Sequence, residues 1–189
     1  MPAPRHTFGL PLRRLVRICA SWVIAFSACR ASAAADEATA KPSFAIDVMQ
    51  ALSKSGCNLG TCHGNANGKG GFKISLRGQD AKLDYLVLTH DQMSRRINVQ
   101  EPDKSLLLLK ATMQQAHEGG RRFARDSYEY RVLRDWIAAG APSDVEQAPK
   151  LEKLVVKPTT EFVLEPTAEG QITAEAHFAD GSRRNVTTT

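Results

Sequence analysis

The sequence predicts a mainly α domain followed by the beginning of an all-β sandwich. Two stretches with helical periodicity, over residues 44–55 and 127–139, indicate the α domain. Beyond a linker at 142–150, the pattern changes to short β-rich runs separated by turn signals. Residues 151–189 provide roughly three strands, whereas an immunoglobulin-type sandwich needs about seven. We therefore expect the chain to be a fragment that ends within its second domain.

Residues 1–33 have the layout of a secretory signal peptide. Arginines precede an apolar run at 18–29, and the small residues Ala31-Ser32-Ala33 follow it. The run is shorter than the about 20 residues that a membrane-spanning helix needs. We therefore expect an exported protein, in the periplasm or at the cell surface, with no stable membrane span after cleavage.

The predicted cleavage changes both the charge and the thiol content of the chain. Residues 1–33 contain five arginines and no acidic residue, so the 25 basic residues fall to 20 and balance the 20 acidic ones. The formal charge of +5 therefore belongs to the leader. We expect no nucleic-acid partner, because such binding requires a basic surface on the folded domain. Cys57 and Cys62 are the thiols that remain.

The α domain, which we place at 44–141, follows a disordered lead-in at 34–43. Ser43 is a predicted N-cap for the first helix, and Gly56 is placed to end it. The apolar residues that fall on one face of this helix are Phe44, Val48 and Leu52. This face is expected to pack into the core.

A glycine-rich loop and two shorter helical segments are expected next. Residues 64–80 contain five glycines and a short alternating stretch, which predicts a loop with some extended structure. Residues 82–90 predict one or two helical turns. Pro102 is expected to open a further helix, whose Leu106–Leu109 run is predicted to be fully buried.

The clearest helix spans residues 127–139. Ser127 is its predicted N-cap and Gly140 its end, and Trp136 belongs to its apolar stripe. We expect Trp136 to pack in the core, against the first helix or a bound cofactor. In the β-rich part, Asp180-Gly181 is a strong signal for a two-residue hairpin turn.

Residues 57–63 read CNLGTCH and place two cysteines and a histidine in one tight loop. Zinc is disfavoured because Cys62 and His63 are adjacent, whereas paired zinc ligands are usually separated by about two to four residues. A disulfide between Cys57 and Cys62 suits an exported protein but leaves His63 without a role. In that alternative the chain is a non-redox interaction or adhesion module, and the helical domain is its scaffold.

Covalent attachment of haem c accounts for all three residues. In c-type attachment, two cysteines form thioethers with the porphyrin edge, and the histidine directly after the second cysteine binds the iron. Cys57 and Cys62 are then cofactor-binding residues, and His63 is the proximal iron ligand. The usual motif has about two intervening residues, but this loop has four. We expect the longer turn to bulge, with Gly60 supplying the backbone freedom.

The cysteine motif, CNLGTCHG, is followed along the chain by three other characteristic segments. They read SLLLLK, HEGGRRF and DWIAAGAP. Together they resemble a planctomycete cytochrome-c-like domain. The tail HFADGSRRNVT is similar to the opening of the bacterial immunoglobulin-like (group 2) domain that follows such domains in large exported proteins. The resemblance implies a cytochrome-c-like haem domain at 44–141 and a partial Ig-like domain at 151–189.

The second axial ligand of the implied haem is expected just before the last helix. A low-spin electron-transfer haem commonly uses methionine or histidine there, and Met113 and His117 lie in one loop. The resemblance favours His117, which begins the HEGGRRF segment, and leaves Met113 as the alternative distal ligand. Arg121 and Arg122 are candidates to pair with the haem carboxylates.

The resemblance implies an exported c-type cytochrome domain for one-electron transfer. Haem supplies the redox chemistry, and the protein sets the iron ligands and the burial of the cofactor. We therefore expect an electron carrier rather than an enzyme by itself. Its partners are redox proteins that the sequence does not identify.

Overall fold

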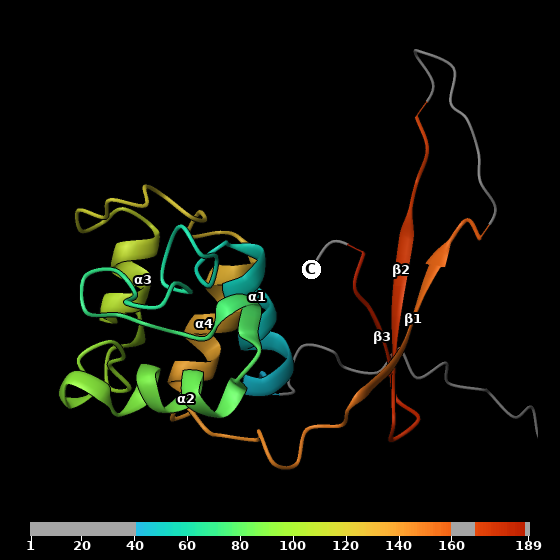
Figure 1. Cartoon of the computed structure of the whole chain (residues 1–189), viewed down its shortest axis with the longest axis horizontal. Helices are drawn as coiled ribbons and strands as arrows, with labels where there is room; N and C mark the ends of the chain where they lie inside the picture. The colour runs from blue at the N-terminus through green and yellow to red at the C-terminus, as the bar shows by residue number, and fades with distance from the viewer. Residues whose placement is uncertain (1–40, 160–168, 188–189) are drawn as a thin grey trace, which may run out of the picture. The chain divides into compact units, whose positions relative to one another are not determined.

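The computed structural model describes residues 41–159 and 169–187 (Figure 1). Within these residues, four α-helices precede a three-stranded antiparallel sheet. The predicted leader at 1–33, most of the lead-in at 34–43 and the run EFVLEP lie outside the described residues. None of the described helices is long and apolar enough to cross a membrane.

The first helical segment forms where the periodicity predicts it. The Ser43 hydroxyl accepts a hydrogen bond of 3.1 Å from the Ile46 amide. One π-helical turn, Phe44–Val48, leads directly into α1, Met49–Lys54. Gly56 follows with a φ of 73°, in the left-handed region that favours glycine. The predicted N-cap and helix end are therefore confirmed.

Helix α2, Ala81–Thr89, confirms the predicted helical turns. The Asp80 carboxylate accepts a hydrogen bond from the Leu83 amide at 2.9 Å and caps the helix. Asp84, on the buried side of α2, accepts hydrogen bonds from the amide and the hydroxyl of Ser75. Asp84 thereby ties the loop that follows the cysteine motif to α2.

Helix α3, Leu106–Ala111, begins later than predicted. Pro102 opens a separate 3₁₀ turn, Pro102–Lys104, because Ser105 takes an extended conformation before α3. Leu107 and Leu108 are buried, but the leucines on either side of them are only partly buried. The prediction of a fully buried leucine run is therefore wrong at its two ends.

Helix α4, Tyr128–Ala138, contacts both α1 and α3 (Figure 1). Its Ser127 N-cap is confirmed, since the hydroxyl accepts a hydrogen bond of 3.2 Å from the Tyr130 amide. Trp136 is fully buried, with its ring centre 5.2 Å from that of Phe44. The core around Trp136 includes Val48, Leu52, Ile74, Leu88, Leu108, Leu133 and Ile137. The first and last helices therefore meet through their predicted apolar faces.

The sheet has the order β1-β2-β3 and is antiparallel throughout. Its strands are β1, Leu151–Lys157, β2, Thr173–Phe178, and β3, Arg183–Asn185. The predicted turn at Asp180-Gly181 joins β2 to β3, and Gly181 has a φ of 81°. The predicted hairpin is therefore confirmed, but the predicted two-residue length is wrong, because the Phe178 amide donates to the Ser182 carbonyl and three residues lie between them.

The predicted fold class is wrong. The described residues form a small α/β protein with four helices and one three-stranded sheet, not a mainly α cytochrome-c-like domain followed by an Ig-like sandwich. A sandwich requires two sheets facing each other, and the three described strands pair into one. In the helical part, three of the four α-helices have nine residues or fewer, and long irregular segments connect them.

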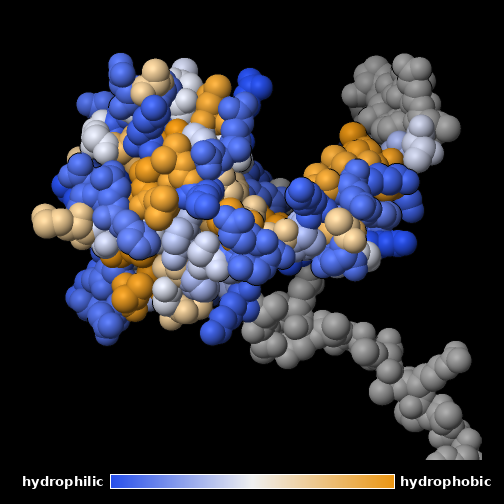
Figure 2. Space-filling view, turned by 60° about the horizontal axis from the view of Figure 1, so that its bottom comes forward, coloured by the Kyte–Doolittle hydropathy of each residue, from blue (hydrophilic) through white to orange (hydrophobic). Residues whose placement is uncertain are grey.

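The surface of the helical part is largely hydrophilic and is interrupted by apolar patches (Figure 2). Leu83 and Leu86 of α2 are among its exposed apolar side chains. Exposed leucines of this kind are common on protein surfaces.

Candidate cofactor site

The cysteine motif forms a tightly wound turn directly after α1. The Cys57 amide donates to the Leu52 carbonyl at 2.9 Å, which holds the first cysteine against the helix end. The His63 amide donates to the Cys57 carbonyl at 3.0 Å. This bond closes the loop, so the four-residue spacing still brings His63 back beside Cys57.

The glycine that this turn requires is Gly64 rather than Gly60. A Cβ atom at Gly64 would lie 2.1 Å from the Asn58 carbonyl oxygen, whereas one at Gly60 would meet only a side chain at 3.8 Å. Gly60 also lacks a left-handed φ. The expectation that Gly60 supplies the backbone freedom is therefore wrong. The sequence signal for this turn is Gly64, directly after His63.

His63 and His117 face each other although they lie far apart in the sequence. Their ring centres are 6.2 Å apart and their planes are inclined by only 14°. His63 Nδ1 donates to the Phe72 carbonyl at 3.0 Å, and His117 Nδ1 donates to the Gly120 carbonyl at 2.8 Å. Because Nδ1 donates in both rings, Nε2 is the nitrogen of each neutral ring that can bind a metal.

The distance between the two ring centres matches that of two imidazoles bound to one metal ion from opposite sides, an arrangement that also requires both Nε2 atoms to point at the ion. A metal–imidazole bond is about 2 Å long, and the ring centre lies about 1 Å farther on, so two rings on opposite sides of one ion have centres roughly 6 Å apart. Among the described residues, no group of three or more His, Cys, Asp and Glu side chains could hold a metal. A macrocycle such as haem brings its own equatorial nitrogens, so two protein ligands complete its coordination.

The two histidines and both cysteines line a cavity of about 520 Å³. This volume lies within the range of about 300 to 1,000 Å³ that is typical of small-molecule and cofactor sites. Its apolar lining includes Phe72, Leu106, Leu107, Ala111 and Ala116. Its charged lining consists of the cations Lys69, Arg95, Arg96 and Lys110 and the single acid Glu118. The cavity therefore suits an apolar ligand that carries negative charge.

Met113 is not among the residues that line this cavity. Its side chain is 46% exposed, and its backbone is in the left-handed region with a φ of 63°, immediately after the C-cap of α3. The loop instead brings His117 to the cavity. Of the two predicted distal ligands, the structure therefore places only His117 opposite His63.

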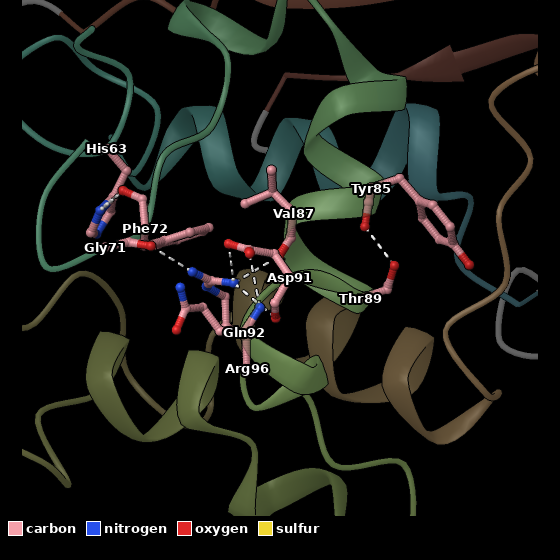
Figure 3. Close-up of polar contacts among 9 residues, drawn as sticks. All are labelled: His63, Gly71, Phe72, Tyr85, Val87, Thr89, Asp91, Gln92 and Arg96. Carbon is pink, nitrogen blue, oxygen red and sulfur yellow. Dashed lines mark hydrogen bonds and ion pairs between the residues drawn. The ribbon is translucent and has the colours of Figure 1, made fainter. Parts of the chain in front are cut away.

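Arg96 supports the loop that carries Phe72 (Figure 3). This buried side chain donates from Nη2 to the Gly71 carbonyl at 2.8 Å and from Nη1 to the Val87 carbonyl at 2.9 Å. It also forms an ion pair with Asp91 at 3.1 Å and lies over the Phe72 ring, 4.7 Å from its centre. Since the Phe72 carbonyl orients His63, Arg96 acts on the candidate ligand through this loop. The sequence offers no signal for this role.

The electrostatic surroundings keep His63 in the form that binds metals. Burial lowers the pKa of His63 below its usual value, and the neighbouring His117 and Arg96 act in the same direction. Hydrogen bonding to the backbone of Phe72 and of Lys69 raises the pKa and opposes these effects only in part. The imidazole is therefore neutral at physiological pH, with Nε2 unprotonated.

Cys57 and Cys62 are both free thiols, and they differ in their surroundings. Cys57 is buried, and this burial raises its pKa to about 11, although Arg122 nearby opposes the shift. Cys62 is partly exposed. Since a thioether forms from each thiol in c-type attachment, the two sites are expected to differ in reactivity.

Alkylation of the cofactor-free protein is expected to modify Cys62 well before Cys57. The thiolate is the reactive form, so a pKa of about 11 leaves only about one in a thousand Cys57 thiols ionised at pH 8. The Cys57 rate should rise about tenfold per pH unit up to that pKa. Peptide mass spectrometry after iodoacetamide treatment measures both rates, with guanidinium-unfolded protein as the control. Equal rates in the folded protein would contradict the assigned burial.

No protein-family model, curated protein or solved structure matches this chain. The chemistry of the site therefore rests on the residues that build it: two opposed imidazoles, two free thiols and a cationic, partly apolar cavity.

Proposed function

We propose that this chain is an exported electron carrier that binds haem c covalently. Cys57 and Cys62 attach the porphyrin edge, His63 is the proximal iron ligand and His117 is the distal ligand. The observation that carries the proposal is the pair of near-parallel imidazoles, 6.2 Å apart, in a cavity that both thiols also line. The CNLGTCHG and HEGGRRF segments add the motif-level resemblance to planctomycete cytochrome-c-like domains.

The lining of the cavity fits the two chemical halves of haem. Leucine and alanine side chains of α3, together with Phe72, suit the apolar macrocycle. Lys69 and Arg95 also line the cavity, and their side chains form no hydrogen bond or ion pair with other described residues. These two cations would be available to pair with the negatively charged carboxylates of a haem.

The residues of the chain set the environment in which electron transfer occurs. When bound, haem supplies an iron ion that changes its charge by one electron. His63 and His117 both line the cavity, and backbone carbonyls occupy both Nδ1 positions, so Nε2 is the nitrogen that each ring would offer to a metal. Two histidine ligands favour a lower reduction potential than a histidine and a methionine. The donor and acceptor of the electron are other redox proteins, and no nucleic acid is involved.

Covalent haem is tested by expressing the chain together with a c-type cytochrome maturation system. We expect a Soret band, a pyridine-haemochrome spectrum that survives acid-acetone extraction, and a mass increase of one haem. The matched control is the double variant Cys57→Ala/Cys62→Ala, from which acid-acetone should extract any haem. A colourless protein that lacks two free thiols would overturn the proposal and support the disulfide-containing interaction module.

A further inference from the structure

We propose that Arg122 is a positioning residue that holds the His117 loop against the cysteine loop and thereby sets the spacing of the two imidazoles. This inference rests on the proposed function, because the spacing matters for binding one iron ion between His63 and His117. It gives Arg122 a different role from the haem-carboxylate pairing that its sequence position suggests.

The Arg122 guanidinium connects the two loops that carry the candidate ligands. Its Nε donates to the Ser55 carbonyl at 2.7 Å, two residues before Cys57. Its Nη1 donates to the Gly119 carbonyl at 3.3 Å, two residues after His117. The planar guanidinium thus links the start of the cysteine loop to the end of the His117-Glu118-Gly119 turn. Its fork geometry suits two carbonyl acceptors.

The position of the Arg122 side chain is fixed from two sides. Its amide donates to the Ala111 carbonyl at 2.7 Å, which anchors its backbone at the last residue of α3. A Cβ atom at Gly56 would lie 2.5 Å from Arg122 Nη2. Gly56 therefore leaves the space that the guanidinium occupies, in addition to ending the first helix.

Gly119 is the residue through which Arg122 acts on the position of His117. A Cβ atom at Gly119 would lie 2.8 Å from His117 Cε1, so the imidazole packs directly against this glycine. The same turn orients the ring, because His117 Nδ1 donates to the Gly120 carbonyl and the Gly120 amide donates back to the His117 carbonyl. Holding the Gly119 carbonyl therefore holds the plane and the place of the His117 ring.

Arg121 provides a matched control at the neighbouring position. It carries the same charge, it is exposed, and its side chain forms no hydrogen bond or ion pair with another described residue. Replacing either arginine with glutamine removes one positive charge from the same segment. Only the Arg122 replacement also removes the link between Ser55 and Gly119.

In the haem-loaded protein, Arg122→Gln is expected to convert a large share of the haem from low spin to high spin and to make the reduced protein bind carbon monoxide. Arg121→Gln is expected to remain low spin, and Arg122→Lys, with one donor centre in place of a fork, should lie between them. Absorption and electron paramagnetic resonance spectra report these states. An Arg122→Gln spectrum that matches Arg121→Gln would overturn the inference. A wild-type protein without haem would overturn the proposed function instead.

Hydrogen exchange in the cofactor-free protein tests the same link without haem. Arg122→Gln should accelerate exchange of the Gly120 amide by at least about tenfold, since hydrogen bonds from a charged donor are the stronger kind. Core amides of α4 should exchange as in wild type, and Arg121→Gln should change neither group. An unchanged Gly120 rate would overturn the inference. An equal acceleration in the α4 core would overturn it as well, because Arg122 would then support the fold in general.

Discussion

His63→Ala is expected to remove the proximal ligand and convert the haem of the loaded protein from low spin to high spin. In the Cys57→Ala/Cys62→Ala background, where haem is held without thioethers, the same change should weaken haem binding by well over about tenfold, because loss of even a supporting residue typically costs about 10- to 100-fold. Among the described residues that line the cavity, the other imidazole is that of His117, which its own turn holds opposite His63.

The paired variant His117→Ala separates the two ligands. We expect it to keep His63 as the axial ligand, to become high spin and to bind carbon monoxide when reduced. His90→Ala is the control, because His90 is exposed, bonds to Thr89 and does not line the cavity. Absorption spectra of the oxidised and reduced proteins measure all three variants. An unchanged low-spin spectrum for His117→Ala would transfer the distal role to Met113, and an unchanged spectrum for His63→Ala would refute the proposed ligation.

Trp136→Ala is expected to lower the free energy of unfolding by about 3 to 5 kcal/mol, a large part of the about 5 to 15 kcal/mol that typical domains possess. The indole is fully buried against Phe44, and its Nε1 donates to the Pro142 carbonyl at 2.9 Å. Alanine leaves a cavity between the first and last helices and leaves that carbonyl without its partner.

One further variant separates the contributions of volume and hydrogen bonding at Trp136, and another serves as a surface control. Trp136→Phe keeps most of the apolar volume and should cost less than the alanine variant. Arg131→Ala, on the exposed side of α4, should change stability by less than about 1 kcal/mol. Urea unfolding followed by circular dichroism measures the three values. A loss for Trp136→Ala no larger than that for Arg131→Ala would contradict the central packing role of the indole.

Much of the local structure was predictable from short sequence patterns. Ser43 and Ser127 cap helices as expected, because a side-chain oxygen satisfies an amide only two or three residues away. The Asp180-Gly181 turn also depends on adjacent residues alone. The fold class was not predictable in this way. Whether β-rich runs form one sheet or two depends on pairing between distant segments, and the described strands form one.

The candidate site likewise has a part that depends on neighbouring residues and a part that depends on contacts between distant segments. By itself, the sequence determined that Cys57, Cys62 and His63 share one loop, because their closeness follows from covalent connectivity. Only the tertiary structure placed His117, rather than Met113, opposite His63, and only it revealed the supports from Arg96 and Arg122. Those contacts join segments separated by whole helices. These contacts depend on the packing of the helical core and on hydrogen bonds to backbone carbonyls. Neither of these produces a periodic or short-range pattern in the sequence.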